Sequence, residues 1–378
     1  MPPMDEHVKD GFLRLTDELV EEVFFRLAPD EPSRLVRASA VRKRWRRILA
    51  DAGFRRRYRE FHKTPPVLGL FNEDTGFVPT SALLPAHPDW RHRWRPMATV
   101  DCRHGRALIT PSNRYFGDFG EGEAFDLTVL DPLTGHQRRV PCPDNDALWF
   151  SAAVLCAAQQ GCCDHHGCQE EHFRVAFVTT DQQKRVTSGS LYSSETRTWN
   201  KLTSVHHPNV TKYTFNQRVP SVLVGDAIYF NIDGVVKCDL GTLRLSMFER
   251  PTNAKGRLMT AEDGGLGFAA VVDVKNLTLW SMETGPEEGA MGWAKLRVIH
   301  LISMLLPDGA LSIPTPEYEI SCIAEGSQVI FISTGACYMV DLKSLQVRKV
   351  SPLARKFFPY MSFYMPAMEA ASTGQAGQ

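Results

Sequence analysis

The sequence lacks several features that would assign it at once to a common class. Acidic and basic residues balance at 43 each, giving a formal net charge of zero, so no global field favours nucleic acid or an anionic membrane. No apolar run is long enough to cross a bilayer, and residues 1–10 lack the apolar core of a signal peptide. The nine cysteines are odd in number and mostly scattered, which favours reduced thiols. We therefore expect a soluble protein of the cytoplasm, the nucleus or both.

Motifs of the common catalytic classes are also missing. Neither G-x-S-x-G nor H-E-x-x-H occurs. Residues 263–267 are rich in glycine but lack the Lys-Ser/Thr ending of a phosphate-binding loop, and no helix is expected after them, which favours a hairpin turn. His104 and Arg106 have no nucleophile with an orienting acid nearby, so we expect a turn between strands there. The sequence favours a chain without catalytic activity.

At 378 residues, 43% hydrophobic, the chain is long enough for two domains, and its most informative segment is residues 15–49. Its apolar residues predict three short amphipathic helices, the first within residues 15–27. Pro29 and Pro32 are expected to end the first helix, and Ser33 to cap the second. A unit this small cannot bury so many large side chains against itself, so we expect part of its surface to contact another protein.

This segment resembles an F-box, whose pattern begins with Leu-Pro, continues through a Leu/Ile/Val-rich helix and ends in Val-Cys-Lys-x-Trp. Thr16 replaces the usual Pro and can serve as a helix N-cap, and Arg42 replaces the usual Cys. The matching residues, in order, are Leu15, Asp17, Glu18, Leu19, Val23, Leu27, Leu35, Val41, Lys43, Trp45 and Phe54. The resemblance implies docking on a Skp1-like subunit. The contact residues that it implies are Leu15, Thr16, Leu19, Val23, Leu27, Leu35, Val41, Lys43 and Trp45.

The basic run from Arg34 to Lys63 allows a different interpretation. Aromatic residues are interleaved with its arginines, as in segments that bind RNA or DNA. We favour the interpretation that the arginines solvate the outer faces of helices whose inner faces are apolar. On this interpretation acidic residues lie mostly elsewhere and the positive field stays local.

Beyond Pro65 the pattern changes to short Val, Ile, Leu, Phe and Tyr runs separated by turn residues, which predicts an all-β structure. A repeat is visible: an apolar strand ends at Asp or Ser, and Thr or Ser follows three positions later. The repeats are centred on Asp131, Ser193, Asp239, Ser281 and Asp341. Their spacing of roughly 40 to 60 residues is that of four-stranded propeller blades.

The repeat predicts a propeller of about six blades if residues 67–77 form a partial first blade. Residues 357–364 are expected to pair with that blade and to close the ring, which removes open sheet edges. We expect inner strands within 221–231, 267–274 and 320–332, and a short helix within 298–306. This part resembles the F-box-associated, kelch-like β-propeller of a large family of plant F-box proteins.

The expected fold is therefore an α+β multidomain protein, with a small three-helix F-box followed by an all-β propeller. The F-box domain is expected at 10–62 and the propeller at 65–368, with flexible tails at 1–9 and 369–378.

A cluster of cysteines and histidines is the only metal candidate that the sequence suggests. It comprises Cys156, Cys162, Cys163, His165, His166, Cys168 and His172. Thiolate and imidazole are ligands that zinc prefers. The spacing is irregular, however, and no second pair of ligands follows. We favour a hydrophilic loop between strands containing Val154 and Val175, and we expect no metal and no cofactor.

The two resemblances together imply a substrate-recognition adaptor of a Skp1–cullin–F-box ubiquitin ligase, with the propeller presenting the protein target. Exposed aromatic and basic side chains are the expected target anchors: Trp90, Trp94, Tyr115, Phe116, Tyr213 and Arg218. The alternatives are a glycan-binding protein or an enzyme that uses the propeller's central pocket, and a nucleic-acid binder that uses the basic helices.

Overall fold

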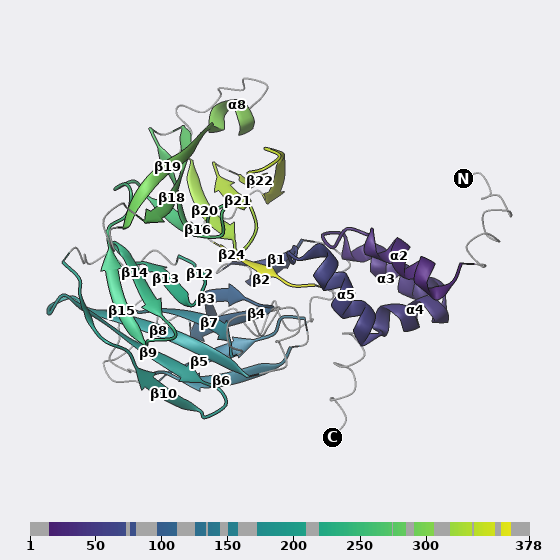
Figure 1. The fold of residues 1–378 in the computed structure, drawn as a ribbon, viewed down its shortest axis with the longest axis horizontal. Helices are drawn as coiled ribbons and strands as arrows, with labels where there is room; N and C mark the ends of the chain where they lie inside the picture. Colours follow the sequence, from purple (N-terminus) through teal and green to yellow (C-terminus); the bar gives the residue numbers. More distant parts are fainter. Residues whose placement is uncertain are drawn as a thin grey trace.

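The protein consists of an N-terminal helical region joined to a six-blade β-propeller (Figure 1). The computed structural model describes residues 15–72, 76–80, 97–111, 125–133, 135–143, 150–157, 172–208, 219–273, 275–284, 291–305, 318–334, 336–351 and 357–363. Within these ranges, every helix is too short or too polar to cross a membrane.

The helical region is built from α2 (Asp17–Phe25), α3 (Pro32–Val41), α4 (Lys43–Ala50) and α5 (Ala52–His62). Thr16 takes the N-cap position of α2 as expected, but its hydroxyl caps no backbone N–H. It bonds instead to the Glu18 carboxylate, and this lowers the pKa of Glu18. The expected cap at Ser33 is wrong, because Pro32 is the first residue of α3 and Glu31 precedes it at the N-cap. Proline fits there because the first helical N–H needs no partner within the helix.

The helices enclose a small aromatic core. Phe24, Phe54 and Tyr58 are almost fully buried, and Phe24 meets Phe54 edge-on with ring centroids 6.2 Å apart. The Tyr58 hydroxyl donates to the backbone oxygen of Leu27 at 2.7 Å, so the one polar group of this core has a partner. Asp51 accepts the N–H of Phe54 at 2.7 Å and thereby starts α5.

Six antiparallel sheets follow. The first joins β2 (Gly76–Pro79), β1 (Val67–Asn72) and β24 (Phe357–Met361); the second runs β3 (Met97–Arg103), β4 (Arg106–Pro111), β5 (Asp126–Leu130), β6 (Gln137–Pro141). The third runs β7 (Phe150–Cys156), β8 (Phe173–Asp181), β9 (Val186–Ser193), β10 (Thr198–Lys201), with β11 (Val205–His206) also on β9. The fourth runs β12 (Val222–Val224), β13 (Ala227–Asn231), β14 (Val235–Asp239), β15 (Arg244–Phe248). The fifth runs β16 (Gly256–Thr260), β17 (Leu266–Val272), β18 (Asn276–Thr284), β19 (Met291–His300), and the sixth β20 (Glu319–Ala324), β21 (Val329–Ser333), β22 (Cys337–Asp341), β23 (Val347–Ser351).

The last strand closes the ring as the sequence predicts. β24 pairs antiparallel with β1, with Phe358 opposite Phe71 and Met361 opposite Val67. β24 lies against β3 on one side and β20 on the other, so it supplies the innermost strand of the first blade. β3 in turn lies against β7, and β16 lies against both β12 and β20. The innermost strands therefore surround a common axis.

The predicted repeat marks the end of the third strand in the second, third, fourth and sixth blades. The Asp239 carboxylate accepts both the N–H and the hydroxyl of Thr242 at 2.8 Å, and Asp341 accepts the N–H of Ser344 at 2.8 Å. The residue four positions after the Asp has a positive φ, 55° at Leu243 and 56° at Leu345.

The fifth blade departs from this plan. Ser281 is buried inside β18, which continues to Thr284, so the turn expected at Ser281 is wrong. A register shift at Leu279 and Trp280 accompanies this longer strand.

The three ranges predicted to hold inner strands differ from the strands of the structure. Residues 221–231 and 320–332 each form two strands, and 267–274 covers the second strand of its blade. The expected helix within 298–306 is α8 (Leu301–Leu305), preceded by β19. The turns expected near residues 104 and 264 are confirmed: His104 and Gly105 join β3 to β4, and the turn after Thr260 leads to β17.

Residues after β24 connect the propeller to the helical region. The Phe363 side chain belongs to the helical core and meets Tyr58 edge-on at 6.3 Å. The N–H of Ser362 donates to the oxygen of Pro66, and Val36 of α3 packs against the apolar cluster between the first and second blades. Figure 1 shows the helical region beside β1, β2 and β24. One short segment thus closes the propeller and fills the core of the helices.

The positive φ of Leu345 predicts that glycine is tolerated better than alanine at this position. An L-residue pays about 1–2 kcal/mol in this conformation and glycine does not, although glycine loses more entropy on folding. Leu345→Gly should therefore be more stable than Leu345→Ala by about 0.5–1 kcal/mol in urea denaturation. At Val298, an extended residue of β19 that pairs with Thr278, the order should be reversed, with Ala more stable than Gly. The same order at both positions would contradict the strain argument.

The position of Phe363 predicts a loss of stability that reaches the helices. Phe363→Ala removes a side chain that is only 7% exposed and should cost about 3 kcal/mol of unfolding free energy. Hydrogen exchange should then accelerate in α5. Phe268→Ala, which opens a cavity between the fourth and fifth blades, serves as the control, since it should cost a similar amount without preferential exchange in α5. Equal exchange patterns in the two variants would refute the coupling.

Candidate functional site

The residues predicted to dock a partner divide into three groups by burial. Leu35 lies in the helical core, 1% exposed. Leu15, Leu27 and Trp45 pack against that core while partly exposed, and Thr16 and Lys43 are exposed. The remaining three are large apolar side chains facing solvent: Leu19 at 50%, Val23 at 38% and Val41 at 61% exposed. We call Leu19, Val23 and Val41 the helical apolar surface.

The helices hold this surface in a defined arrangement. Leu19 and Val23 are one turn apart on α2, directly beside the buried stripe of Val20 and Phe24, so the apolar face of α2 is wider than its core contact. The Arg44 side chain donates to Asp17 at 2.5 Å and to the backbone oxygen of Leu15 at 2.8 Å. These bonds bring the α3–α4 junction to the start of α2.

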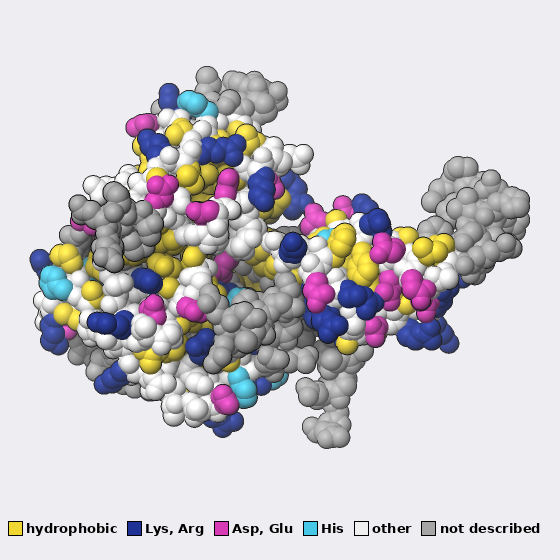
Figure 2. Space-filling model, in the orientation of Figure 1, with side chains coloured by type: hydrophobic (Ala, Val, Ile, Leu, Met, Phe, Trp, Pro, Cys, Tyr) yellow, Lys and Arg dark blue, Asp and Glu magenta, His cyan; other side chains and the backbone are white. Residues whose placement is uncertain are grey.

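Val41 therefore lies at the same end of the helical region as the first turns of α2. Figure 2 shows hydrophobic side chains among charged ones on the visible face of this region.

The basic run of the helices is partly neutralised. Arg44 and Arg47 both form ion pairs with Asp17, and Arg57 pairs with Glu21 of α2. The expectation that acidic residues lie mostly elsewhere is wrong for this surface, because α2 supplies them from the sequence just before the run. This pairing favours a structural role for these arginines over nucleic-acid binding.

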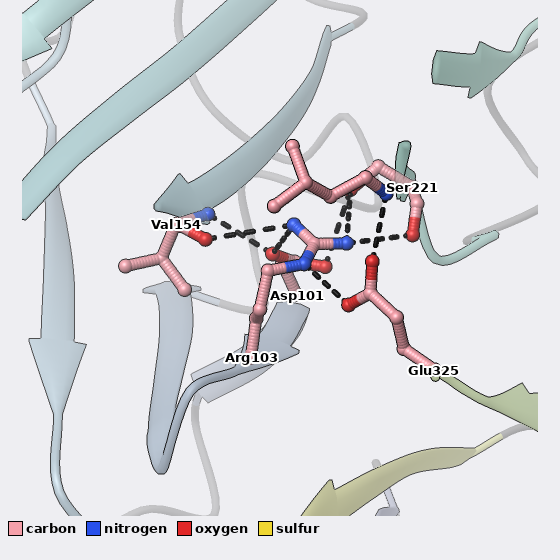
Figure 3. A network of polar contacts seen from close by, with 6 residues as sticks. Asp101, Arg103, Val154, Ser221 and Glu325 are labelled. Atoms are coloured by element: carbon pink, nitrogen blue, oxygen red, sulfur yellow. Dashed lines mark hydrogen bonds and ion pairs between the residues drawn. The ribbon is translucent and has the colours of Figure 1, made fainter. Parts of the chain in front are cut away.

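A second site lies where four blades meet near the propeller axis (Figure 3). Arg103 of β3 donates to Asp101 at 3.0 Å, to the backbone oxygen of Ser221 at 2.8 Å and, from Nε, to Glu325 beyond β20. Asp101 also accepts the N–H of Val154 in β7 at 2.9 Å, and Glu325 accepts the N–H of Leu223 in β12 at 2.7 Å. We call Asp101, Arg103, Ser221 and Glu325 the axial network.

Burial and charge set the protonation of this network. Burial raises the pKa of Asp101 to about 6, although the Arg103 charge opposes the change. For Arg103 burial acts in the lowering direction, but the carboxylates of Asp101 and Glu325 outweigh it and raise the pKa. Both side chains are at most 2% exposed. The guanidinium is therefore a fixed cation joining the second, third, fourth and sixth blades.

A narrow cavity adjoins the axial network. Its lining includes Cys102, Ser221, Arg257, Thr260 and Glu325. The volume is about 30 Å³, enough for an ordered water but too small for a sugar or a nucleotide. Among the described cavities this axial one does not support the glycan-binding or enzymatic alternative.

Several predicted residues lie outside the described part of the chain. These are the target-binding candidates Trp90, Trp94, Tyr115, Phe116, Tyr213 and Arg218, and the loop residues Cys162, Cys163, His165, His166 and Cys168. The ends of that loop are described: Cys156 ends β7, His172 precedes β8, and Val154 pairs with Val175 as expected for the two flanking strands. Among the described residues no cluster of His, Cys, Asp or Glu suits a metal ion.

The sequence analysis missed the axial network. Asp101 and Arg103 lie beside His104, which the motif search considered, and their spacing of two places both on one face of a strand. Two opposite charges two positions apart, just before the turn expected at His104, were the available signal. Glu325 gave none, because it is 222 residues from Arg103 in the chain.

No family model matches the chain, and no curated protein matches it in sequence. Solved structures are similar at low identity. TolB from Acinetobacter baumannii has 12% identity and a TM-score of 0.37 over 68% of this chain and 52% of TolB, so the chain spans about half of TolB. The β-propeller domain of the Trilobed protease from Pyrococcus furiosus has 10% identity and a TM-score of 0.34 over 68% of this chain and 83% of that domain. A chain of a nidogen/laminin complex has 8% identity and a TM-score of 0.40 over 77% of this chain and 97% of that chain. The six-blade assignment rests on the sheet topology, and these similarities say nothing of activity or partners.

The axial network predicts a pH-dependent penalty for losing its cation. Arg103→Met leaves Asp101 and Glu325 without their counterion and should cost about 3–5 kcal/mol of stability near pH 8. Because Asp101 takes up a proton as the pH falls through about 6, the penalty should shrink toward pH 5. Urea denaturation at several pH values measures both effects.

Arg139→Met is the matched control, since Arg139 is exposed on β6, and it should change stability by less than about 0.5 kcal/mol at every pH. A penalty for Arg103→Met that grows toward acid pH would contradict the assignment of a charged Asp101 as the partner.

Proposed function

We propose that this protein is the substrate-recognition adaptor of a Skp1–cullin–F-box ubiquitin ligase. The helical region would dock a Skp1-like subunit, and the propeller would hold the protein target. The observation that carries the proposal is the helical apolar surface: Leu19, Val23 and Val41 are exposed on a small region whose own core is already filled. Apolar side chains of this size in solvent favour a protein partner. The F-box resemblance in the sequence of the same helices gives that partner its class.

The connection between the two parts suits an adaptor. A ligase adaptor works by proximity, which converts the meeting of target and conjugating enzyme into an effectively intramolecular step. This gain is largest when the target is held at a fixed distance and angle. Phe363 packs in the helical core, and Val36 packs against the apolar cluster between the first and second blades, so the helical region is held in a fixed position beside the propeller.

The proposal asks no covalent chemistry of this chain. The described axial cavity is too small for a substrate, and Asp101 and Arg103 beside it are occupied in linking blades. Target binding would then fall to the loop faces of the propeller, where exposed aromatic and basic side chains are the expected anchors. The residues predicted for that role belong to segments outside the described ranges.

A double substitution on the helical apolar surface tests the proposal. Leu19→Asp with Val23→Asp places two charges where an apolar partner surface would desolvate them. Co-purification with a Skp1-like protein and a cullin should fall at least about a hundredfold. Because both side chains are exposed, thermal unfolding of the purified variant should change little.

The matched control carries the same charges on the propeller. Leu296 and Val298 of β19 are exposed to a similar degree, and Leu296→Asp with Val298→Asp should retain the partner. Undiminished capture by the helical variant, or no capture of a Skp1-like protein by the parent chain, would defeat the proposal.

A further inference from the structure

Arg257 is a buried cation near the propeller axis that the adaptor proposal does not use. It lies on β16, the innermost strand of the fifth blade, and is 4% exposed. Its side chain lines the axial cavity, together with Ser221, Thr260 and Cys102. A buried guanidinium normally finds acceptors for most of its donors, since an unpaired buried charge is costly.

The donors of Arg257 are poorly satisfied. One terminal nitrogen donates to the backbone oxygen of the preceding Gly256 at 3.2 Å, and the other lies 4.0 Å from a carboxylate oxygen of Glu319. The Glu319 side chain is 40% exposed, so water screens this distant pair. Among the described residues, Nε of Arg257 has no acceptor.

The acidic side chain in the cavity lining, Glu325, already has hydrogen-bond partners. One oxygen of Glu325 accepts from Arg103 and the other from the N–H of Leu223. Asp101 is likewise held by Arg103 and by the N–H of Val154. Both carboxylates therefore serve Arg103.

The neighbouring thiols do not supply the missing negative charge. Burial raises the pKa of Cys322 and of Cys102 well above the ordinary value, so both stay protonated at neutral pH. Burial also lowers the pKa of Arg257, because no nearby carboxylate compensates it fully. A bound anion is the group that would restore this balance.

We propose that the axial cavity binds one small inorganic anion, of the size of chloride, against Arg257. A volume of about 30 Å³ admits a monatomic ion and excludes an amino acid, a sugar or a nucleotide. Arg257 lies in the cavity lining with its buried cation only weakly paired, and Thr260, which carries a hydroxyl, lies in the same lining. The ion would stabilise the ring where inner strands of several blades converge.

Thermal unfolding of the full chain in chloride tests the site. Chloride replaces gluconate up to about 200 mM at constant ionic strength, so general screening does not change. The parent should gain about 2–4 °C in melting temperature, because only the folded state binds the ion. Arg257→Met should lose this gain.

Arg297→Met is the matched control, since Arg297 is half-buried in the same blade with its donor satisfied by Leu342, and it should respond to chloride as the parent does. Diffraction from bromide-soaked crystals of the parent gives a second measurement that needs no variant. An anomalous peak within about 3.5 Å of the Arg257 guanidinium supports the site. A parent without chloride response, an unaltered response in Arg257→Met, or the absence of that peak would overturn it.

Discussion

The propeller depends on one guanidinium that is shared among blades. A ring of sheets packs mainly through apolar side chains, which attract without direction and allow neighbouring blades to slide. Arg103 adds direction, because its planar donors fix Asp101 within its own blade, Ser221 before the fourth blade and Glu325 after β20 of the sixth. The N–H groups of Val154 and Leu223 complete the set. These bonds set where the innermost strands stand relative to one another.

The same network bears on what the propeller can do. Charges at the centre of a propeller resemble a catalytic site in composition, yet Asp101, Arg103 and Glu325 bond to one another and to neighbouring blades. A group that holds the scaffold in place cannot change its protonation or partners during a reaction without loosening the ring. Recognition is better placed on the outer faces, where loops can vary without disturbing the axis. This division agrees with the binding role that we propose for the propeller.

The sequence predicted those features that depend on residues close to one another in the chain, such as helices and turns. The first helix appears because apolar residues recur every three or four positions, and the turns after Asp239 and Asp341 appear because a carboxylate reaches N–H groups two or three residues on. Ring closure was predicted because pairing of the C-terminal aromatic strand with the first blade removes open sheet edges.

The sequence predictions failed where contacts between residues far apart in the chain determine the structure. Ser281 matches the repeat, but β18 pairs with β19 along its whole length, so the strand continues past it. The axial network joins side chains up to 222 residues apart, which local pattern cannot place.

The placement of Phe363 has a consequence for synthesis in the cell. The helices end at His62, and about 300 further residues must be translated before Phe363 exists. At about 5–20 residues per second, the helices wait outside the ribosome for roughly 15–60 s with an incomplete core. During the same interval β1 has only β2 beside it, and an isolated hairpin is marginal in water. A nascent chain thus completes the core of its helical region only after β24 and Phe363 have been translated. A chain released earlier would carry an unfilled helical core and an unpaired edge on β1. Translation through residue 363 is in this sense the final folding step, and the first helices made are among the last to be finished.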